Sequence, residues 1–275
     1  MSTSVTSRAR AALLGFFGAP LTIDPTLSEH AELALAMARS ITEVGSFEHV
    51  LVREAYYDWL DDGPAHISEA VYAGLNGRYE IESEVHVPLA RVVPLGIHGA
   101  VLNPEVLREY ARFDGATTHV NEFLLQYNEL FAHLLAEAIR GVPSFAFLHE
   151  RLTEVAIERN YGLTLKRVLH EARTLAPHEY RTKPGWAAVS IGNLVYQLER
   201  TDDAAAALAD TIERGGAVRE HAALLGAAFG ALYGEDALPA SWLDAVNAYD
   251  EARPTEYLLR DVPALAERLL RQPEE

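Results

Sequence analysis

The sequence predicts an all-α fold, a single-domain helical bundle, and three observations support this prediction. Apolar residues recur at helical spacing along nearly the whole chain, and only residues 85–95 show the alternation that is typical of a strand. No stretch rich in Gly, Ser or Pro divides the 275 residues, so we expect one domain over residues 1–275. A hydrophobic fraction of 49% is enough to build a substantial core in a chain of this length.

The apolar stretch over residues 11–21 follows two arginines and superficially looks like a signal peptide. Gly15, Gly18 and Pro20 interrupt it, and no small-x-small cleavage site follows. We therefore expect a buried first helix. No later stretch reaches about 18 uninterrupted apolar residues, so we expect no membrane span and a cytoplasmic protein.

The later helices follow from capping and stop signals. Thr26 and Glu29 have the spacing of a capping box, which predicts a helix that ends near residue 43. Ser46 is expected to cap a second helix, which the Asp-Asp-Gly-Pro run at 61–64 stops. Residues 76–100 are expected to be the least helical part of the chain. Further helices are expected at 67–75, from Asn103-Pro104 onward, from Thr118 to Gly141, at 144–159, from Thr164 to Thr174, and at 185–199, 202–214, 218–233, 239–248 and 262–271.

Charge and composition exclude several classes of function. The chain has 23 Lys and Arg against 40 Asp and Glu, a net charge of −17, and its only lysines are Lys166 and Lys183. Nucleic acid and anionic membranes are therefore not expected as partners, because both require clustered basic residues. The absence of cysteine excludes disulfides, zinc–thiolate sites and cysteine nucleophiles.

Standard catalytic motifs are absent from the sequence. There is no P-loop and no Gly-rich dinucleotide fingerprint, and His149-Glu150 does not continue to a second histidine at metalloprotease spacing. His66 and Glu69 lie three residues apart, which is typical of a solvated helix face. The residues alone therefore leave the function open.

A family resemblance is carried by the C-terminal part of the chain. Residues 215–234 read GGAVREHAALLGAAFGALYG, and Leu-Pro-Ala-Ser-Trp-Leu follows at 238–243. Gly226 and Gly230 lie on one helical face, so a second helix can approach this one closely. The segment resembles the C-terminal signature of the ADP-ribosylglycohydrolase family, in which Gly-Gly-Asp-Thr-Asp-Thr precedes such a helix. Weaker matches in the correct order occur at 8–20, 33–41, 91–96 and Thr118-His119, and they imply the family's all-α bundle.

The residues that bind metal in the family are largely replaced here. The resemblance implies two magnesium ions between two acidic motifs, which fall on residues 28–31 and 217–220. Ala217 and Val218 have no side-chain oxygen, and Arg219 places a permanent cation where a dication would lie, at a cost of several kcal/mol. We therefore expect no metal and no other cofactor. The segment between the opening helix and the first motif is also shortened to residues 21–27, which puts ADP-ribose recognition in doubt.

The replacement residues form the candidate site. His30 is expected as the acid/base group, Glu29 or Glu220 as its partner, and Arg219 as an electrostatic stabiliser. Alternatively, Arg219 forms a structural salt bridge with Glu29 or Glu220 in place of the lost ions. Substrate-binding candidates are three positions carried over from the family motifs, Thr22, Ser28 and His86, together with His119 and His221.

Three functions remain open on this basis. The first is a repurposed, metal-independent enzyme of the isomerase, cyclase, lyase or hydrolase type, as found in biosynthetic pathways. Such an enzyme would act on a small organic or nucleoside-like molecule. The second is an inactive relative that binds ADP-ribose or a related nucleotide, and the third is a scaffold protein. The oligomeric state is not predicted. We favour the first function, because several of the motif positions that differ from the family hold side chains with functional groups and not only apolar residues.

Overall fold

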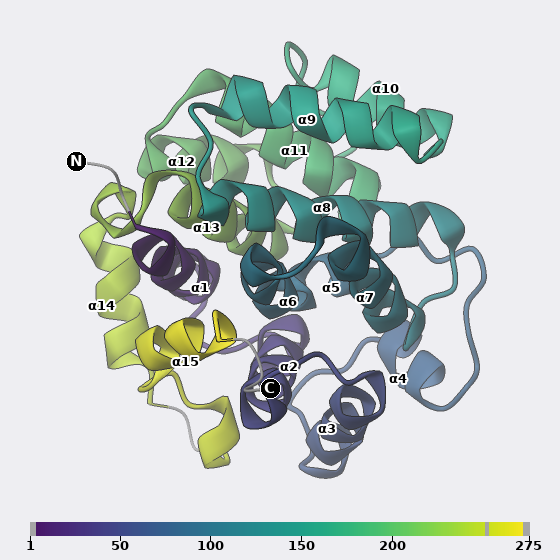
Figure 1. Cartoon of the computed structure of the whole chain (residues 1–275), viewed down its shortest axis with the longest axis vertical. Coiled ribbons are helices and arrows are strands. Elements are labelled where there is room, and N and C mark those ends of the chain that lie inside the picture. The colour runs from purple at the N-terminus through teal and green to yellow at the C-terminus, as the bar shows by residue number, and fades with distance from the viewer. Residues whose placement is uncertain (1–3, 251–252, 272–275) are drawn as a thin grey trace.

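A computed structural model describes residues 4–250 and 253–271, and within these ranges the chain is all-α (Figure 1). This confirms the fold class. The helices are α1 Val5–Leu21, α2 Glu29–Val44, α3 His49–Asp61, α4 Glu69–Leu75, α5 Val87–Arg91, α6 Val93–His98, α7 Pro104–Ala116, α8 Glu122–Arg140, α9 Phe145–Glu158, α10 Leu163–Glu171, α11 Ala187–Arg200, α12 Ala204–Arg214, α13 Val218–Tyr233, α14 Ala240–Ala248 and α15 Val262–Leu269, with short 3₁₀ turns at Gly99–Val101, Glu235–Ala237 and Thr255–Tyr257. None of the helices in the described ranges is long and apolar enough to cross a membrane.

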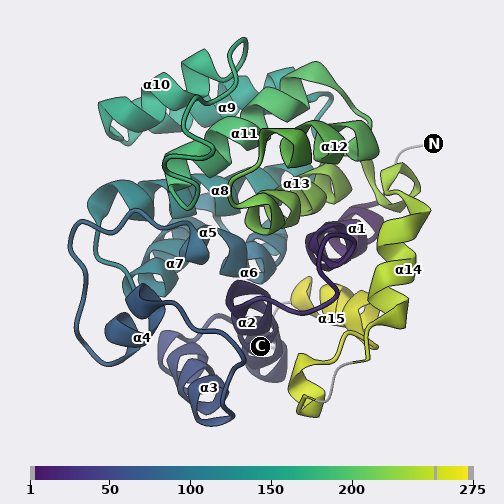
Figure 2. The same cartoon turned by 180° about the vertical axis from the view of Figure 1, so that it is seen from behind.

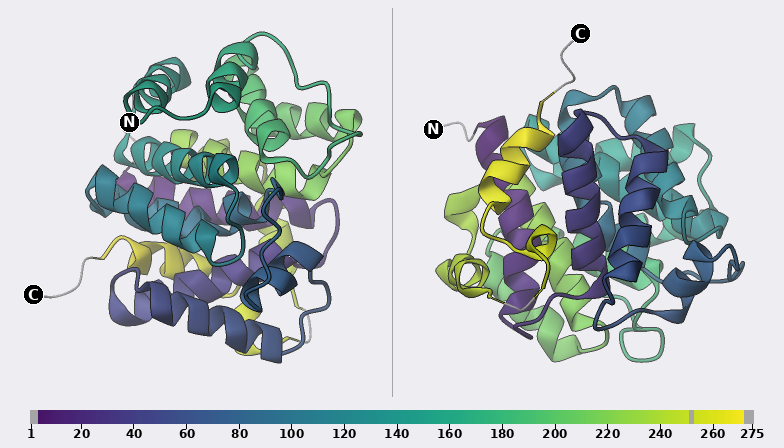
Figure 3. Two further views of the ribbon diagram at one scale, coloured as in Figure 1. Left: turned by 90° about the vertical axis from the view of Figure 1, so that its right-hand side faces the viewer. Right: turned by 90° about the horizontal axis from the view of Figure 1, so that it is seen from below.

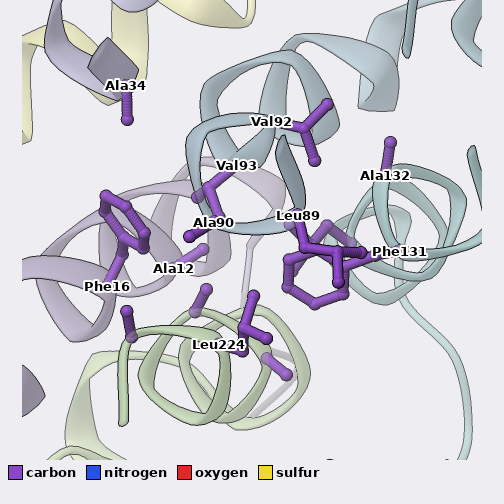
Figure 4. Close-up of a cluster of buried hydrophobic side chains, with 14 of the residues drawn as sticks. Ala12, Phe16, Ala34, Leu89, Ala90, Val92, Val93, Phe131, Ala132 and Leu224 are labelled. Atoms are coloured by element: carbon purple, nitrogen blue, oxygen red, sulfur yellow. The ribbon is translucent and has the colours of Figure 1, made fainter. Parts of the chain in front are cut away.

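The helices are stacked around a central group. Helices α9 and α10 lie at one end of the molecule and α2 and α3 at the other, with α1, α8 and α13 between them (Figures 1 and 3). Side chains from several helices meet in one core: Figure 4 shows Phe16 of α1, Leu89 of α5, Phe131 of α8 and Leu224 of α13 converging. The burial of this shared core is the main stabilising contribution to the fold.

The centre of the fold is the pair α1 and α13, which pack side by side in antiparallel directions. Gly226 lies opposite Gly15, and Gly230 lies opposite Ala11. A Cβ atom built on Gly226 would lie 2.0 Å from the carbonyl oxygen of Gly15. The expectation that small residues on this face admit a close helix is therefore confirmed, and the partner is the first helix of the chain.

The strand-like alternation at 85–95 is a wrong prediction. These residues form α5 and α6, and the described residues contain only an isolated antiparallel bridge between Val85 and Trp186. Pro88 and Pro94 lie in the first turns of the two helices. Backbone N–H groups have no helical partner there, so proline costs no hydrogen bond. These two prolines therefore favour helix starts and do not mark irregular structure.

Several expected N-caps are also wrong. Thr26 does not cap α2, because its hydroxyl donates to Asp24 Oδ1 at 2.8 Å and Ser28 occupies the cap position. Helix α3 begins after Glu48, to which Ser46 donates a hydrogen bond. Helices α8 and α10 begin after Asn121 and Gly162 instead of at Thr118 and Thr164. Helices α7 and α9 do begin where they are expected, after Asn103 and Ser144, whose side chains cap them.

Candidate functional site

A polar pocket of about 440 Å³ lies where four segments that are distant in sequence meet. The first turns of helices α2, α5 and α13 (Figure 2) contribute to it, and α5 contacts both of the other two helices. The loop before α4 supplies the remaining wall. We call this cavity the Glu–His pocket. Its lining residues are Ser28, Glu29, His30, His66, Ile67, Ser68, Val85, His86, Val87, Arg219 and Glu220.

Three of the expected site residues lie outside the lining of this pocket. Thr22 is exposed at the end of α1, and its hydroxyl donates to the carbonyl oxygen of Ala19 at 2.7 Å. His119 and His221 are fully buried nearby, and the His221 ring lies edge-on to the His86 ring with centroids 6.1 Å apart. These two histidines therefore support the pocket from behind, while Thr22 has a capping role.

Arg219 points to the edge of the pocket and not across it. Its Nη1 lies 2.8 Å from Asp24 Oδ2, and its Nη2 donates to the carbonyl oxygen of Thr26 at 2.6 Å. The expected salt bridge to Glu29 or Glu220 is therefore wrong, because the guanidinium pairs with the short loop before α2 instead. Arg219 fastens this loop to the first turn of α13.

We expect Arg219→Gln to lower the free energy of unfolding by about 1 kcal/mol or less, because Asp24 is largely solvated and exposed ion pairs contribute little. A double-mutant cycle with Asp24→Asn, followed by urea denaturation, measures the coupling between the two side chains. A coupling energy above about 2 kcal/mol would contradict this account, since it would require a desolvated pair.

The two carboxyl groups of the pocket have pKa values shifted in opposite directions. Burial raises the pKa of Glu29, although its Oε2 accepts a hydrogen bond from the Ser68 backbone N–H at 2.7 Å. Burial also acts to raise the pKa of Glu220, but the nearby His30 and His86 and its own backbone N–H outweigh it, so that pKa is lowered. Glu29 therefore keeps its proton to a higher pH than Glu220 does.

Two buried histidines complete the polar wall. Burial lowers the pKa of His30 and of His86 to about 4, so both are neutral at pH 7. His30 Nε2 and Ser28 Oγ share a hydrogen bond of 2.8 Å, and His86 Nδ1 lies 2.9 Å from Ser190 Oγ. Ser190 Oγ also lies 3.3 Å from the carbonyl oxygen of Trp186, which can accept its only proton, and on this basis we assign the His86 proton to Nδ1. The Nε2 atom of His86 is then an acceptor.

A buried ion pair lies behind the residues that line the pocket. Arg91 and Asp114 are both fully buried, with Nε 3.1 Å from Oδ2. Arg91 Nη1 also donates to Thr118 Oγ1 at 2.7 Å, and the Thr118 hydroxyl lies 2.8 Å from His119 Nδ1. This network explains why Thr118 is unavailable as a helix cap. Loss of either Arg91 or Asp114 would leave the other buried charge without a partner.

The residues present do not fit the dinuclear magnesium site that the family resemblance implies. Ala217 and Val218 begin α13 without any side-chain oxygen, and the pocket lining contains only Glu29 and Glu220 as carboxylates. In the described ranges, no group of three or more His, Asp or Glu side chains is arranged to hold a metal ion.

Sequence reasoning missed one wall of the pocket. His66, Ile67 and Ser68 precede α4, and Ser68 both caps that helix and donates its N–H to Glu29. The local spacing of His66 and Glu69 indicated a solvated face, and His66 is indeed exposed, but it lies at the pocket rim. The only signal in the sequence was the helix cap, which does not reveal a contact with residues 39 positions earlier.

The geometry defines an all-α protein whose polar pocket lies at helix N-terminal ends. All of residues 1–275 match the family model described as ADP-ribosylglycohydrolase, and the chain therefore belongs to this family. A solved structure entitled "ADP-ribosylglycohydrolase-related protein complex" has a TM-score of 0.80 and 23% sequence identity, covering 99% of this chain and 100% of that one. This likeness shows the fold alone. No curated protein matches the sequence.

Proposed function

We propose that the chain is a metal-independent enzyme built on the ADP-ribosylglycohydrolase scaffold. It acts on a small organic or nucleoside-like molecule by acid/base chemistry, as an isomerase, cyclase, lyase or hydrolase. The observation that carries this proposal is the meeting of Glu29 and Glu220 in one pocket with pKa values shifted apart. Such a split is how paired carboxyl groups divide the acid and base roles.

Each pocket residue has a role in this proposal. Glu29 has the higher pKa of the two carboxyl groups and takes the acid role, while ionised Glu220 accepts a proton from the substrate. We assign proton donation to Glu29 and not to His30, because His30 is neutral and its Nε2 is engaged by Ser28. His30 and His86 orient the substrate through hydrogen bonds. Arg219 shapes the entrance through the loop that it fastens.

We expect Glu29→Gln and Glu220→Gln each to abolish turnover, by a factor of about 100 or more, while the fold survives. An extract of cellular metabolites is incubated with the chain in the presence of EDTA, and mass spectrometry identifies compounds that are consumed. Glu213→Gln is the matched control, because Glu213 is an exposed carboxylate on the preceding helix.

The outcomes separate the candidate functions. Consumption of a metabolite by the wild type and the control, but not by either pocket variant, supports the proposal. Loss of consumption in EDTA, or equal consumption by the pocket variants, would overturn it. If nothing is consumed while calorimetry shows ADP-ribose binding in EDTA, the chain is a binding protein and the enzymatic proposal fails.

A further inference from the structure

The groups that face the Glu–His pocket are mainly hydrogen-bond acceptors. Glu220 contributes an ionised carboxylate, and Glu29 contributes the oxygen that Ser68 does not bind. The His86 side chain is almost fully buried, and its Nδ1 is held by Ser190, so its unprotonated Nε2 remains for a ligand in the pocket. Each of these atoms can accept a hydrogen bond from a donor group on a bound molecule.

The cations near the pocket are committed to other partners. Arg219 binds Asp24 and Thr26 at the rim, and Arg91 binds Asp114 and Thr118 behind the wall. Both guanidinium groups are therefore already paired with a carboxylate, and the unpartnered Nε of Arg219 is buried. An anionic ligand would meet Glu220 with no free arginine to offset the repulsion.

Helix N-terminal ends ordinarily attract anions, but here the chain supplies the anions itself. Helix α4 receives the Glu29 carboxylate at its Ser68 cap, and the Glu220 carboxylate accepts from its own backbone N–H in the first turn of α13. A phosphate would have to displace these carboxylates. The backbone geometry thus does not favour a phosphate ligand.

Three apolar residues also line the pocket. Ile67 and Val85 are partly buried against the core, and Val87 is almost fully buried. A ligand that fills the pocket can therefore place a hydrocarbon body against these side chains while its polar end meets the acceptors.

We propose that the Glu–His pocket binds a compact organic cation, with an ammonium or amidinium group between Glu29, Glu220 and His86 and an apolar body against Ile67, Val85 and Val87. This inference rests on the proposed function only in that it concerns the same pocket. It names the class of substrate, and it distinguishes the pocket from one that holds a nucleotide diphosphate.

Three ligands of one shape and different charge test the inference: cyclohexylamine, cyclohexanol and cyclohexanecarboxylate. Each is titrated into the full chain at neutral pH by calorimetry, and the imidazole resonances of His30 and His86 are followed by NMR. We expect the ammonium ion to bind at least tenfold more tightly than the alcohol, to shift those resonances, and to outcompete the carboxylate entirely. Glu220→Gln should weaken amine binding at least tenfold, and Glu213→Gln should not change it.

Two results would overturn the cation preference. One is binding of the alcohol or the carboxylate as tightly as the amine, and the other is no amine binding at millimolar concentration. The inference and the proposed function can fail separately. Amine binding without consumption of any metabolite would refute only the enzyme, whereas consumption of an anionic metabolite would refute only the cation preference.

Discussion

Replacement of Gly226 by valine is expected to abolish folding. A Cβ atom at this position would lie 2.0 Å from the Gly15 carbonyl oxygen, and a Cβ atom at Gly15 would lie 2.2 Å from the Gly226 carbonyl oxygen. Both contacts are with backbone, so no side-chain rotation can relieve them. Because ordinary contact begins at 3.4 Å, α1 and α13 would have to separate by roughly 1.4 Å at the centre of the core.

The separation would disrupt the core to which Phe16 of α1 and Leu224 of α13 both belong (Figure 4). We expect a cost above about 4 kcal/mol, a large part of the stability of a domain this size. Soluble yield, circular dichroism and thermal unfolding measure the effect. Gly185→Ala is the matched control: its nearest neighbour, Val85 Cγ1, lies at 3.8 Å, so we expect little change. A Gly226→Val variant with wild-type melting behaviour would contradict the close-packing account.

The same helix pair shows what could be predicted from the sequence and what could not. The spacing of Gly226 and Gly230 predicts a close helix contact, because that pattern lies within one element. It does not identify the partner, because the choice of α1 depends on contacts more than 200 residues apart in the chain. The helical periodicity is local in the same way, which explains why the fold class was predictable.

The errors at helix ends have a different physical cause. Thr26 and Thr118 have the right chemistry for an N-cap, but other side chains bind their hydroxyl groups. Asp24, two residues before Thr26, accepts from its hydroxyl, and Arg91 donates to the Thr118 hydroxyl from elsewhere in the fold. Both contacts orient the hydroxyl toward a partner other than a helix N-terminus. The capping pattern does not contain this competition, and the contact of Thr118 with Arg91 is tertiary.

The candidate site was predictable only as far as the family resemblance extends. The two motif positions, at Ser28–His30 and Arg219–Glu220, do meet in one pocket. The direction of the Arg219 side chain was not predictable, because it depends on the loop that carries Asp24. The role of Ser68 was missed for the same reason as the tertiary use of Thr118.

Acidification to pH 5 is expected to unfold the protein. Burial is the main cause that lowers the pKa of five histidines in the folded chain, to about 4 for His30, His86 and His133 and about 3 for His119 and His221. The unfolded value is 6.5, so between pH 6.5 and about 4 the unfolded chain binds protons that the folded chain does not. Stability is therefore complete above pH 6.5 and falls as the pH is lowered through this window.

The size of the effect follows from linkage. Each histidine contributes about 1.4 kcal/mol per pH unit, so five together cost on the order of 10 kcal/mol at pH 5, which matches the whole stability of an ordinary domain. The raised pKa of Glu29 acts in the opposite direction, but it is a single group. Urea denaturation at intervals from pH 7.5 to about pH 5 measures the slope.

One histidine can be isolated by mutation. Neither ring nitrogen of His221 has a hydrogen-bond partner among the described residues, so His221→Leu removes a titrating group without breaking a hydrogen bond. We expect the variant to be about 2 kcal/mol more stable than wild type at pH 5, relative to any difference at pH 7.5. His170→Leu makes the same change at an exposed position and should leave the pH profile unchanged. If His221→Leu kept the full wild-type slope, His221 would have to be protonated in the folded protein.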